Sequence, residues 1–162
     1  LVGEGARGEE VGARLERRMR MVAADIPLSE RPRGLYLGVL GRGLYGGANR
    51  TSFHDVLEAA GLRDVLAHMD SWPELTPEQV LELDPDVVLV PEGTARVLCD
   101  RDGLRTLRVC LRDGDAQVVE LPSEVLNDPG MGMLLAAERL RMAVHGAPAS
   151  VTPSPSEEPS PE

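Results

Sequence analysis

Residues 76–90 read TPEQVLELDPDVVLV and carry the clearest local structure signals in the chain. Thr76 is a preferred helix N-cap, and Pro77 suits the first helical position. Gln79 stands three residues after the cap, where a capping box places its second side chain. These residues predict a short helix that ends at Leu83.

Three apolar segments of the sequence are predicted to be buried strands. Asp84-Pro85 ends the helix, and residues 86–90 (DVVLV) follow as the second of these strands in chain order. Residues 34–40 (GLYLGVL) form an almost unbroken apolar run, and residues 117–121 follow a turn signal. Continuous apolar runs are typical of parallel sheets, whose strands are covered on both faces.

Helical patterns lie between these strands. Apolar residues recur at three- and four-residue steps over residues 9–24, and a second helix should begin at Thr51 or Ser52. Residues 94–99 predict another short helix, and residues 131–145 predict the closing one. Because strands alternate with helices, we expect an α/β fold, a three-layer α/β/α lobe with a mostly parallel central sheet.

The composition narrows the classes of function. The 162 residues suffice for one ordinary domain, and a formal net charge of -10 disfavours binding to nucleic acid phosphates. With one tryptophan, two tyrosines and one phenylalanine, the chain also offers few rings for stacking on bases. We therefore expect no nucleic acid partner.

The two cysteines, Cys99 and Cys110, lie eleven positions apart. They do not form the paired CxxC pattern of zinc ribbons, so no metal site is expected from them. Spacing leaves open whether they form a disulfide, because the separation of their Cα atoms decides it. Two free, partly buried thiols are the favoured interpretation.

Residues 41–46 (GRGLYG) match the GxGxxG pattern of dinucleotide-binding loops. In that pattern the third glycine opens a helix, and an acidic residue about 20 positions later binds a ribose hydroxyl. Here the helix signals begin only at Thr51 or Ser52, and position 61 is Gly61. A small cytosolic α/β nucleotide-binding or enzymatic domain that uses Gly41 to Gly46 therefore stays the alternative. The favoured interpretation of residues 41–50 is a glycine-rich loop at the carboxyl end of a strand.

The order of these elements resembles the second lobe of the periplasmic proteins that bind iron-siderophores, haem and cobalamin for ABC importers. Three motifs carry the resemblance: residues 51–62 (TSFHDVLEAAGL), residues 72–81 (WPELTPEQVL) and residues 83–90 (LDPDVVLV). It covers about residues 9–145. It implies half of a class III periplasmic binding protein, a fold in which two lobes enclose the ligand.

The resemblance also implies a division of the chain. Residues 1–27 would be the end of the interlobe helical segment, and residues 28–145 the carboxy-terminal lobe. Residues 146–162 are rich in Pro, Ser and Glu and are predicted to be a disordered tail.

The implied function is the substrate-binding component of an ABC importer for a metal chelate, namely a ferric siderophore, haem or cobalamin. The resemblance implies no enzymatic activity and no cofactor besides the chelate ligand. The implied partners are an ABC permease and an N-terminal lobe that is missing here. The expected location is the periplasm, or a membrane-anchored position outside the cytoplasm. Because the chain begins at Leu1 and shows no leader pattern, we expect that any export signal was removed or lies outside it.

Loops at the strand ends bind the ligand in this family. Carried onto this chain, these loops are residues 41–50, 91–96 and 122–130. The side chains expected to contact the ligand are Arg42, Tyr45, Asn49, Arg50 and Glu92. Arginine can bind ligand carboxylates with two hydrogen bonds, and tyrosine can ligate iron or stack on a macrocycle. Which chelate is bound does not follow from the sequence.

An acidic residue on each lobe of such proteins docks onto arginines of the permease, and the matching residue here is Glu78. A carboxylate in the first turn of a helix is stabilised by the helix dipole and can pair with arginine. The histidines His54, His68 and His145 are not spaced as a metal site. His54 as a haem ligand is therefore the less favoured interpretation.

Overall fold

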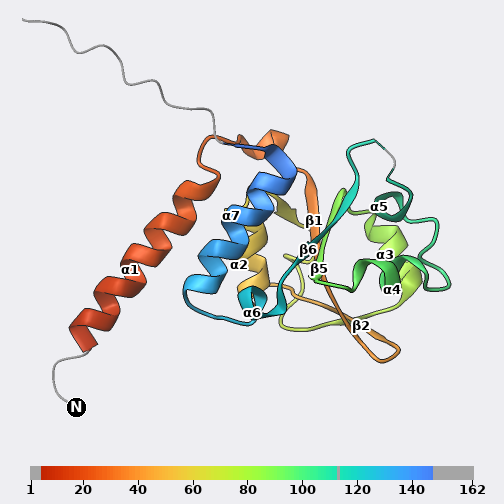
Figure 1. Cartoon of the computed structure of the whole chain (residues 1–162), viewed down its shortest axis with the longest axis horizontal. Coiled ribbons are helices and arrows are strands. Elements are labelled where there is room, and N and C mark those ends of the chain that lie inside the picture. The colour runs from red at the N-terminus through yellow and green to blue at the C-terminus, as the bar shows by residue number, and fades with distance from the viewer. Residues whose placement is uncertain (1–4, 113, 148–162) are drawn as a thin grey trace, which may run out of the picture.

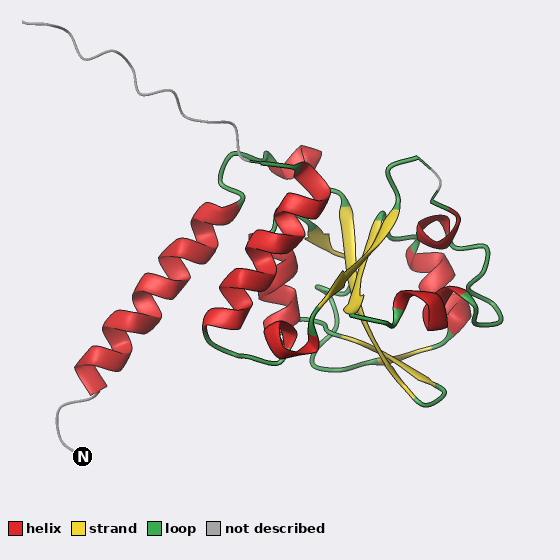
Figure 2. Cartoon of the chain, viewed as in Figure 1, coloured by secondary structure: helices red, strands yellow, loops and turns green. Residues whose placement is uncertain are grey.

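The computed structural model of the chain describes residues 5–112 and 114–147. A central sheet lies between helices on its two faces (Figures 1 and 2). The strands are β1 (Arg33–Leu40), β2 (Gly43–Gly46), β3 (Arg63–Asp64), β4 (Glu74–Leu75), β5 (Val87–Pro91) and β6 (Gln117–Leu121). The helices are α1 (Gly5–Val22), α2 (Ser52–Ala59), α3 (Pro77–Leu83), α4 (Ala95–Cys99), α5 (Arg108–Leu111), α6 (Ser123–Leu126) and α7 (Met131–His145), with a 3-10 turn at Leu28–Glu30.

The sheet is mostly parallel, as the sequence predicts. Its strand order is β4-β2-β1-β5-β6, and β3 pairs with the start of β1. β1 runs parallel to β3 and β5, with Leu35 opposite Val88, and β5 runs parallel to β6. The antiparallel pairs are β1 with β2 and β2 with β4. The carboxyl ends of β1, β5 and β6 therefore share one edge of the sheet, which we call the carboxyl edge.

Each face of the sheet has its own hydrophobic core. Tyr36 and Leu89 point to the face that α2, α6 and α7 cover, whereas Leu35 and Val88 point to the face of α3, α4 and α5. Successive side chains alternate in this way because strand residues point to opposite faces in turn. The three-layer α/β/α lobe expected from the sequence is thus confirmed.

Capping residues start two helices where the sequence predicts them. The hydroxyl of Thr51 accepts a hydrogen bond from the backbone amide of His54 at 3.4 Å. Thr76 and Gln79 form the predicted capping box, in which the Gln79 amide donates to the Thr76 hydroxyl at 3.3 Å. The Thr76 amide donates to the Gln79 side chain at 2.8 Å. Both helices therefore have their first amides satisfied by local side chains.

Asp86 explains why a Pro-Asp pair precedes β5. One carboxylate oxygen accepts from the backbone amide of Arg33 at 2.8 Å, and the other accepts from Arg108 at 2.7 Å. The Arg108 guanidinium also donates to Asp84 at 2.8 Å. These bonds join the amino ends of β1 and β5 to α5, at the edge of the sheet opposite the carboxyl edge.

The segment of residues 41–50 is not only the glycine-rich loop that the sequence predicts. Gly43–Gly46 forms β2, which pairs with β1 in a hairpin, with Leu40 opposite Gly43. Gly41 takes a φ of 59°, which suits a glycine in a tight hairpin turn. No helix opens at Gly46, so the GxGxxG pattern builds a hairpin in place of a phosphate-binding loop.

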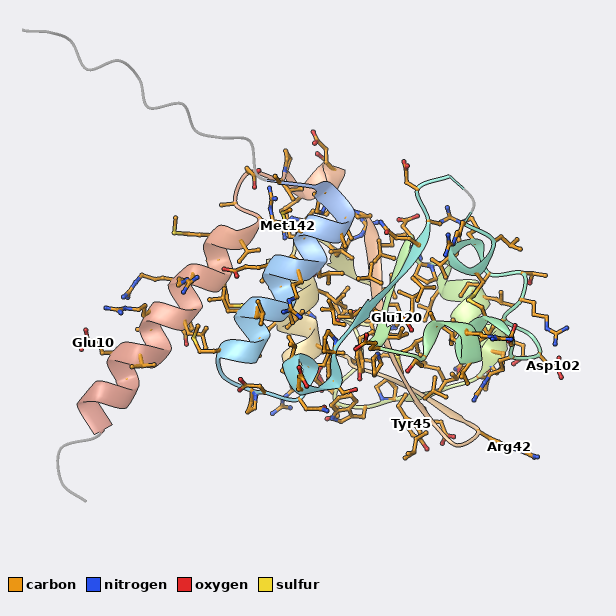
Figure 3. The ribbon with its side chains drawn as sticks, viewed as in Figure 1. Glu10, Arg42, Tyr45, Asp102, Glu120 and Met142 are labelled. Carbon is orange, nitrogen blue, oxygen red and sulfur yellow. A yellow bond between two sulfur atoms is a disulfide. The ribbon has the colours of Figure 1, made fainter. Side chains whose placement is uncertain are left out.

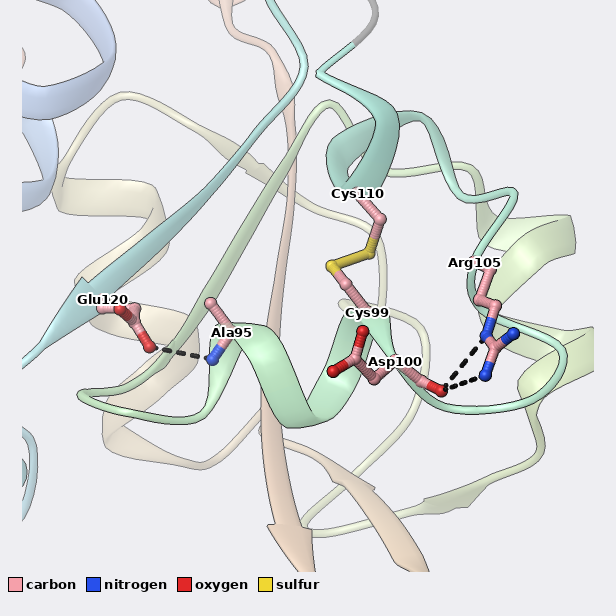
Figure 4. The surroundings of a disulfide bond; sticks show 6 residues. All are labelled: Ala95, Cys99, Asp100, Arg105, Cys110 and Glu120. Carbon is pink, nitrogen blue, oxygen red and sulfur yellow. Dashed lines mark hydrogen bonds between the residues drawn. A yellow bond between two sulfur atoms is a disulfide. The ribbon is translucent and has the colours of Figure 1, made fainter.

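Cys99 and Cys110 form a disulfide, so the favoured interpretation as free thiols is wrong (Figure 4). Their Cα atoms are 5.4 Å apart, within the range that a disulfide requires. The tertiary structure brings them together because the chain turns back between α4 and α5. Spacing alone could not show this turn.

α1 is the outermost helix and lies alongside α7 and α2 (Figure 1). None of the helices in the described part of the chain has both the length and the apolar character of a membrane span. The tail predicted to be disordered lies outside the described residues, apart from Gly146 and Ala147.

Candidate functional site

Three aromatic side chains meet at the carboxyl edge. Tyr36 in β1 stacks on Phe53 at the start of α2, with 3.6 Å between the ring centroids. Trp72 lies edge-on to both rings, at 6.2 Å from Tyr36 and 5.3 Å from Phe53. Tyr36 and Phe53 are buried, whereas Trp72 is 50% exposed. The buried pair therefore supports a tryptophan ring that is partly open to solvent.

A glycine makes this aromatic packing possible. A Cβ atom at Gly47 would lie 2.7 Å from the Phe53 Cβ and 3.0 Å from the Tyr36 ring. A larger residue at this position would therefore force Phe53 or the Tyr36 ring to shift. Burial also raises the pKa of the Tyr36 hydroxyl, so the phenol stays protonated at neutral pH.

Two chain segments lie side by side next to the aromatic cluster. Asn49 pairs with Asp70 in a parallel bridge, and its side-chain amide donates to the Asp70 carboxylate at 3.2 Å. The Arg50 guanidinium lies 4.0 Å from the same carboxylate. Arg50 and Ser71 have φ values of 66° and 63°, which are uncommon for residues other than glycine and concentrate at functional sites.

The structure brings two of the predicted ligand residues together with Trp72. Asn49 and Arg50 are on one of these paired segments, and Trp72 follows directly on the other. Glu92 is exposed in the turn after β5, and its backbone amide donates to the Leu121 carbonyl oxygen at the end of β6. It therefore lies on the same edge, at the ends of the neighbouring strands.

Arg42 and Tyr45 lie farther out, on the β1–β2 hairpin. Arg42 is exposed in the turn, and Figure 3 shows it at the tip, pointing away from the body of the lobe. Tyr45 is half-buried on β2, opposite Gly38. Arg42 is thus separated from Asn49 and Arg50 by the length of β2, whereas Tyr45 lies near the end of β2 and pairs with Glu74 in β4.

Trp72 was missed by reasoning from the sequence, although a signal was present. It is the only tryptophan in the chain, and it stands in a polar connecting segment just before Pro73. No neighbouring helix or strand pattern accounts for a large ring in such a segment. The tertiary structure accounts for it, as the exposed member of the aromatic cluster.

Glu78 is exposed in the first turn of α3. Its own backbone amide and the Thr76 hydroxyl hydrogen bond to it and lower the pKa of its carboxyl group, so the side chain is ionised at neutral pH. Leu75, just before the helix, pairs with Leu44, which pairs with Val39 near the end of β1. The carboxylate is therefore presented at the carboxyl edge.

His54 and His145 both have structural partners. The Nδ1 atom of His54 lies 2.7 Å from the Asp64 carboxylate, whose side chain is fully buried. The Nε2 atom of His145 lies 3.1 Å from the Gly61 carbonyl oxygen. His68 is exposed. Among the described residues, no group of three or more His, Cys, Asp or Glu side chains could hold a metal ion.

A family model described as periplasmic binding protein matches residues 1–132 of the chain. No curated protein matches the chain.

Three solved structures illustrate the likeness in fold. The periplasmic haem-binding protein RhuT from Roseiflexus sp. RS-1 is 23% identical, with a TM-score of 0.69, over 88% of this chain and 57% of that one. The periplasmic haem-binding protein BhuT in complex with two haems is 25% identical, with a TM-score of 0.65, over 85% of this chain and 55% of that one.

The third structure is an ABC-type Fe3+-hydroxamate transport system protein from Saccharomonospora viridis DSM 43017. It is 26% identical, with a TM-score of 0.66, over 85% of this chain and 49% of that one. The chain thus spans about half the length of the solved structures that it matches.

Proposed function

Because the chain belongs to the periplasmic binding protein family, we propose that it is one lobe of the substrate-binding component of an ABC importer for a metal chelate. The ligand classes are ferric siderophores, haem and cobalamin. The similar structures, two haem-binding proteins and an Fe3+-hydroxamate transport protein, support this choice. The observation that carries it is the aromatic cluster, which exposes Trp72 at the edge where α/β sheets bind ligands.

In this proposal different residues at the carboxyl edge contact different parts of the ligand. The Trp72 ring contacts an apolar or flat part of the chelate, while Asn49 and Arg50 hydrogen bond to its polar groups. The rings of Tyr36 and Phe53 are already stacked and buried before any ligand arrives. Binding to such a preformed surface costs little ordering entropy.

The proposal includes a location outside the cytoplasm, in the periplasm or anchored to a membrane. The disulfide between Cys99 and Cys110 supports it, because disulfides persist in oxidising compartments. The proposed partners are a second lobe, which would complete the ligand cleft, and an ABC permease. Glu78 is the proposed permease contact, since its ionised carboxylate is exposed at the same edge and can pair with arginine.

Trp72 also provides the test, because the fluorescence of this single tryptophan reports on the site. The chain and the complete gene product are titrated with haemin, cyanocobalamin and a ferric hydroxamate, with a free tryptophan analogue as the control for light absorption. Saturable quenching by one chelate class is the expected result. Failure of all three chelates to quench either protein would overturn the proposed function.

A further inference from the structure

Arg101 holds the tip of the β1–β2 hairpin by its backbone. One guanidinium nitrogen donates to the Arg42 carbonyl oxygen at 2.7 Å, and another donates to the Gly41 carbonyl oxygen at 3.1 Å. Hydrogen bonds from a charged donor are stronger than those between neutral groups. Arg101, which follows α4, thus hydrogen bonds to the backbone of a turn some sixty positions earlier in the chain.

Arg101 is itself carried on a turn that is firmly held. The Cys99–Cys110 disulfide closes this turn, and within it the Arg105 guanidinium donates to the Asp100 carbonyl oxygen at 3.2 Å (Figure 4). Two leucines of the turn are buried in the core, Leu104 and Leu107. Contacts within the turn therefore hold the backbone of Arg101, independently of the hydrogen bonds that its side chain makes to the hairpin.

The same turn packs against the start of α3. A Cβ atom at Gly103 would lie 2.9 Å from the Cβ of Pro77, so the backbone of the turn directly contacts the residue before Glu78. Figure 3 shows Asp102 of this turn and Arg42 of the hairpin on the same side of the molecule. The hairpin tip, the turn and the start of α3 therefore form one continuous surface.

We propose that Arg101 is a positioning residue, which clasps the hairpin tip to the α4–α5 turn and fixes Leu40 and Arg42 relative to Glu78. Leu40 is 76% exposed although it is a large apolar residue, and Arg42 beside it is also exposed. An apolar side chain, a cation and an ionised carboxylate on one held surface suit a protein partner with a complementary patch. The identification of this partner as the permease rests on the proposed function, whereas the clasp itself does not.

Hydrogen exchange of the chain without ligand tests the clasp. Arg101→Ala should make the amides of β2 exchange about tenfold faster, as expected when hydrogen bonds to a charged group are lost, while β5 and β6 keep their rates. Arg101→Lys keeps the charge but cannot reproduce the two-pronged geometry, so it should give an intermediate rate. It also serves as the second variant if Arg101→Ala does not fold.

Arg139→Ala is the control, because it removes an exposed guanidinium from α7, outside both the hairpin and the α4–α5 turn. This variant should leave the exchange of β2 unchanged. If β2 exchanges at the wild-type rate in both Arg101 variants, or as fast in Arg139→Ala as in Arg101→Ala, Arg101 does not clasp the hairpin.

Affinity of the complete gene product for its permease in lipid nanodiscs tests the docking surface separately. Leu40→Ser, Arg101→Ala and Glu78→Gln should each weaken binding, whereas Glu82→Gln, one helical turn along α3, should not. If only Glu78→Gln weakens binding, the hairpin tip is not a contact. If Glu78→Gln has no effect either, the proposed docking role of Glu78 fails, and the exchange result stands by itself.

Discussion

The ring of Trp72 lies edge-on to the ring of Phe53, with 5.3 Å between the centroids and 75° between the planes. The Phe53 ring is in turn held by its stack on the buried ring of Tyr36. Trp72 is therefore held in one orientation while half of its surface stays open. An exposed ring on a rigid base is suited to bind a ligand without much contribution to the stability of the fold.

Trp72→Ala should weaken binding of the chelate identified by fluorescence by roughly 30-fold, the effect of losing about 2 kcal/mol of apolar burial. The thermal midpoint should change little, because the ring is half exposed. Isothermal titration calorimetry and thermal unfolding measure the two effects. Met142→Ala is the control, since Met142 is equally exposed but lies on α7. Unchanged affinity in the Trp72 variant would exclude the ring from the site.

Gly47→Ala should destabilise the fold by about 1–3 kcal/mol, because the added methyl group overpacks the buried rings of Tyr36 and Phe53. Gly12→Ala in α1 is the matched control. Nothing lies within 4 Å of its added Cβ atom, so it should stabilise the chain by about 0.5–1 kcal/mol. Urea unfolding should therefore give changes of opposite sign, and equal effects would show that Gly47 has no special packing role.

Replacement of Cys99 and Cys110 by serine should lower the free energy of unfolding by about 3 kcal/mol, the chain-entropy contribution of a short disulfide loop. Reduction of the wild-type chain should have a similar effect. Urea unfolding with and without reductant measures both. A reductant effect in the double variant would instead point to a cause other than the disulfide.

Stability should fall as the pH drops through the range in which His145 titrates. Burial lowers the pKa of His145 below its ordinary value of 6.5, and the nearby charges of Arg141 and Arg31 act in the same direction, against Asp25 and the Gly61 carbonyl. The folded chain thus binds this proton less readily than the unfolded chain. The free energy of unfolding is therefore highest above the ordinary pKa and decreases between that value and the lower folded pKa.

Urea unfolding of the wild type and of His145→Gln, at pH about 7.5 and about 5.5, measures this dependence. The variant should lose less stability on acidification than the wild type. An equal loss in both proteins would assign the pH dependence to other groups.

The sequence alone determined the elements whose signals lie within a few residues. The capping residues Thr76 and Gln79 satisfy amides of their own helical turn, and the apolar run before Pro91 is buried whichever strand pairs with it. Glu78 was placed at the start of α3 by the same local logic. Such features can be predicted from neighbouring residues because they need no distant partner.

Only the tertiary structure decided which distant segments meet. Gly43–Gly46 contains two glycines and has little strand propensity by itself, yet it forms β2 because β1 and β4 supply hydrogen-bonding partners on its two sides. Cys99 bonds to Cys110, and Trp72 packs against Phe53. The turns that bring these residues together could not be predicted from any local sequence pattern. The physical reason is that their contact energies depend on the separation in space of residues far apart in the chain, which the packing of the whole lobe sets.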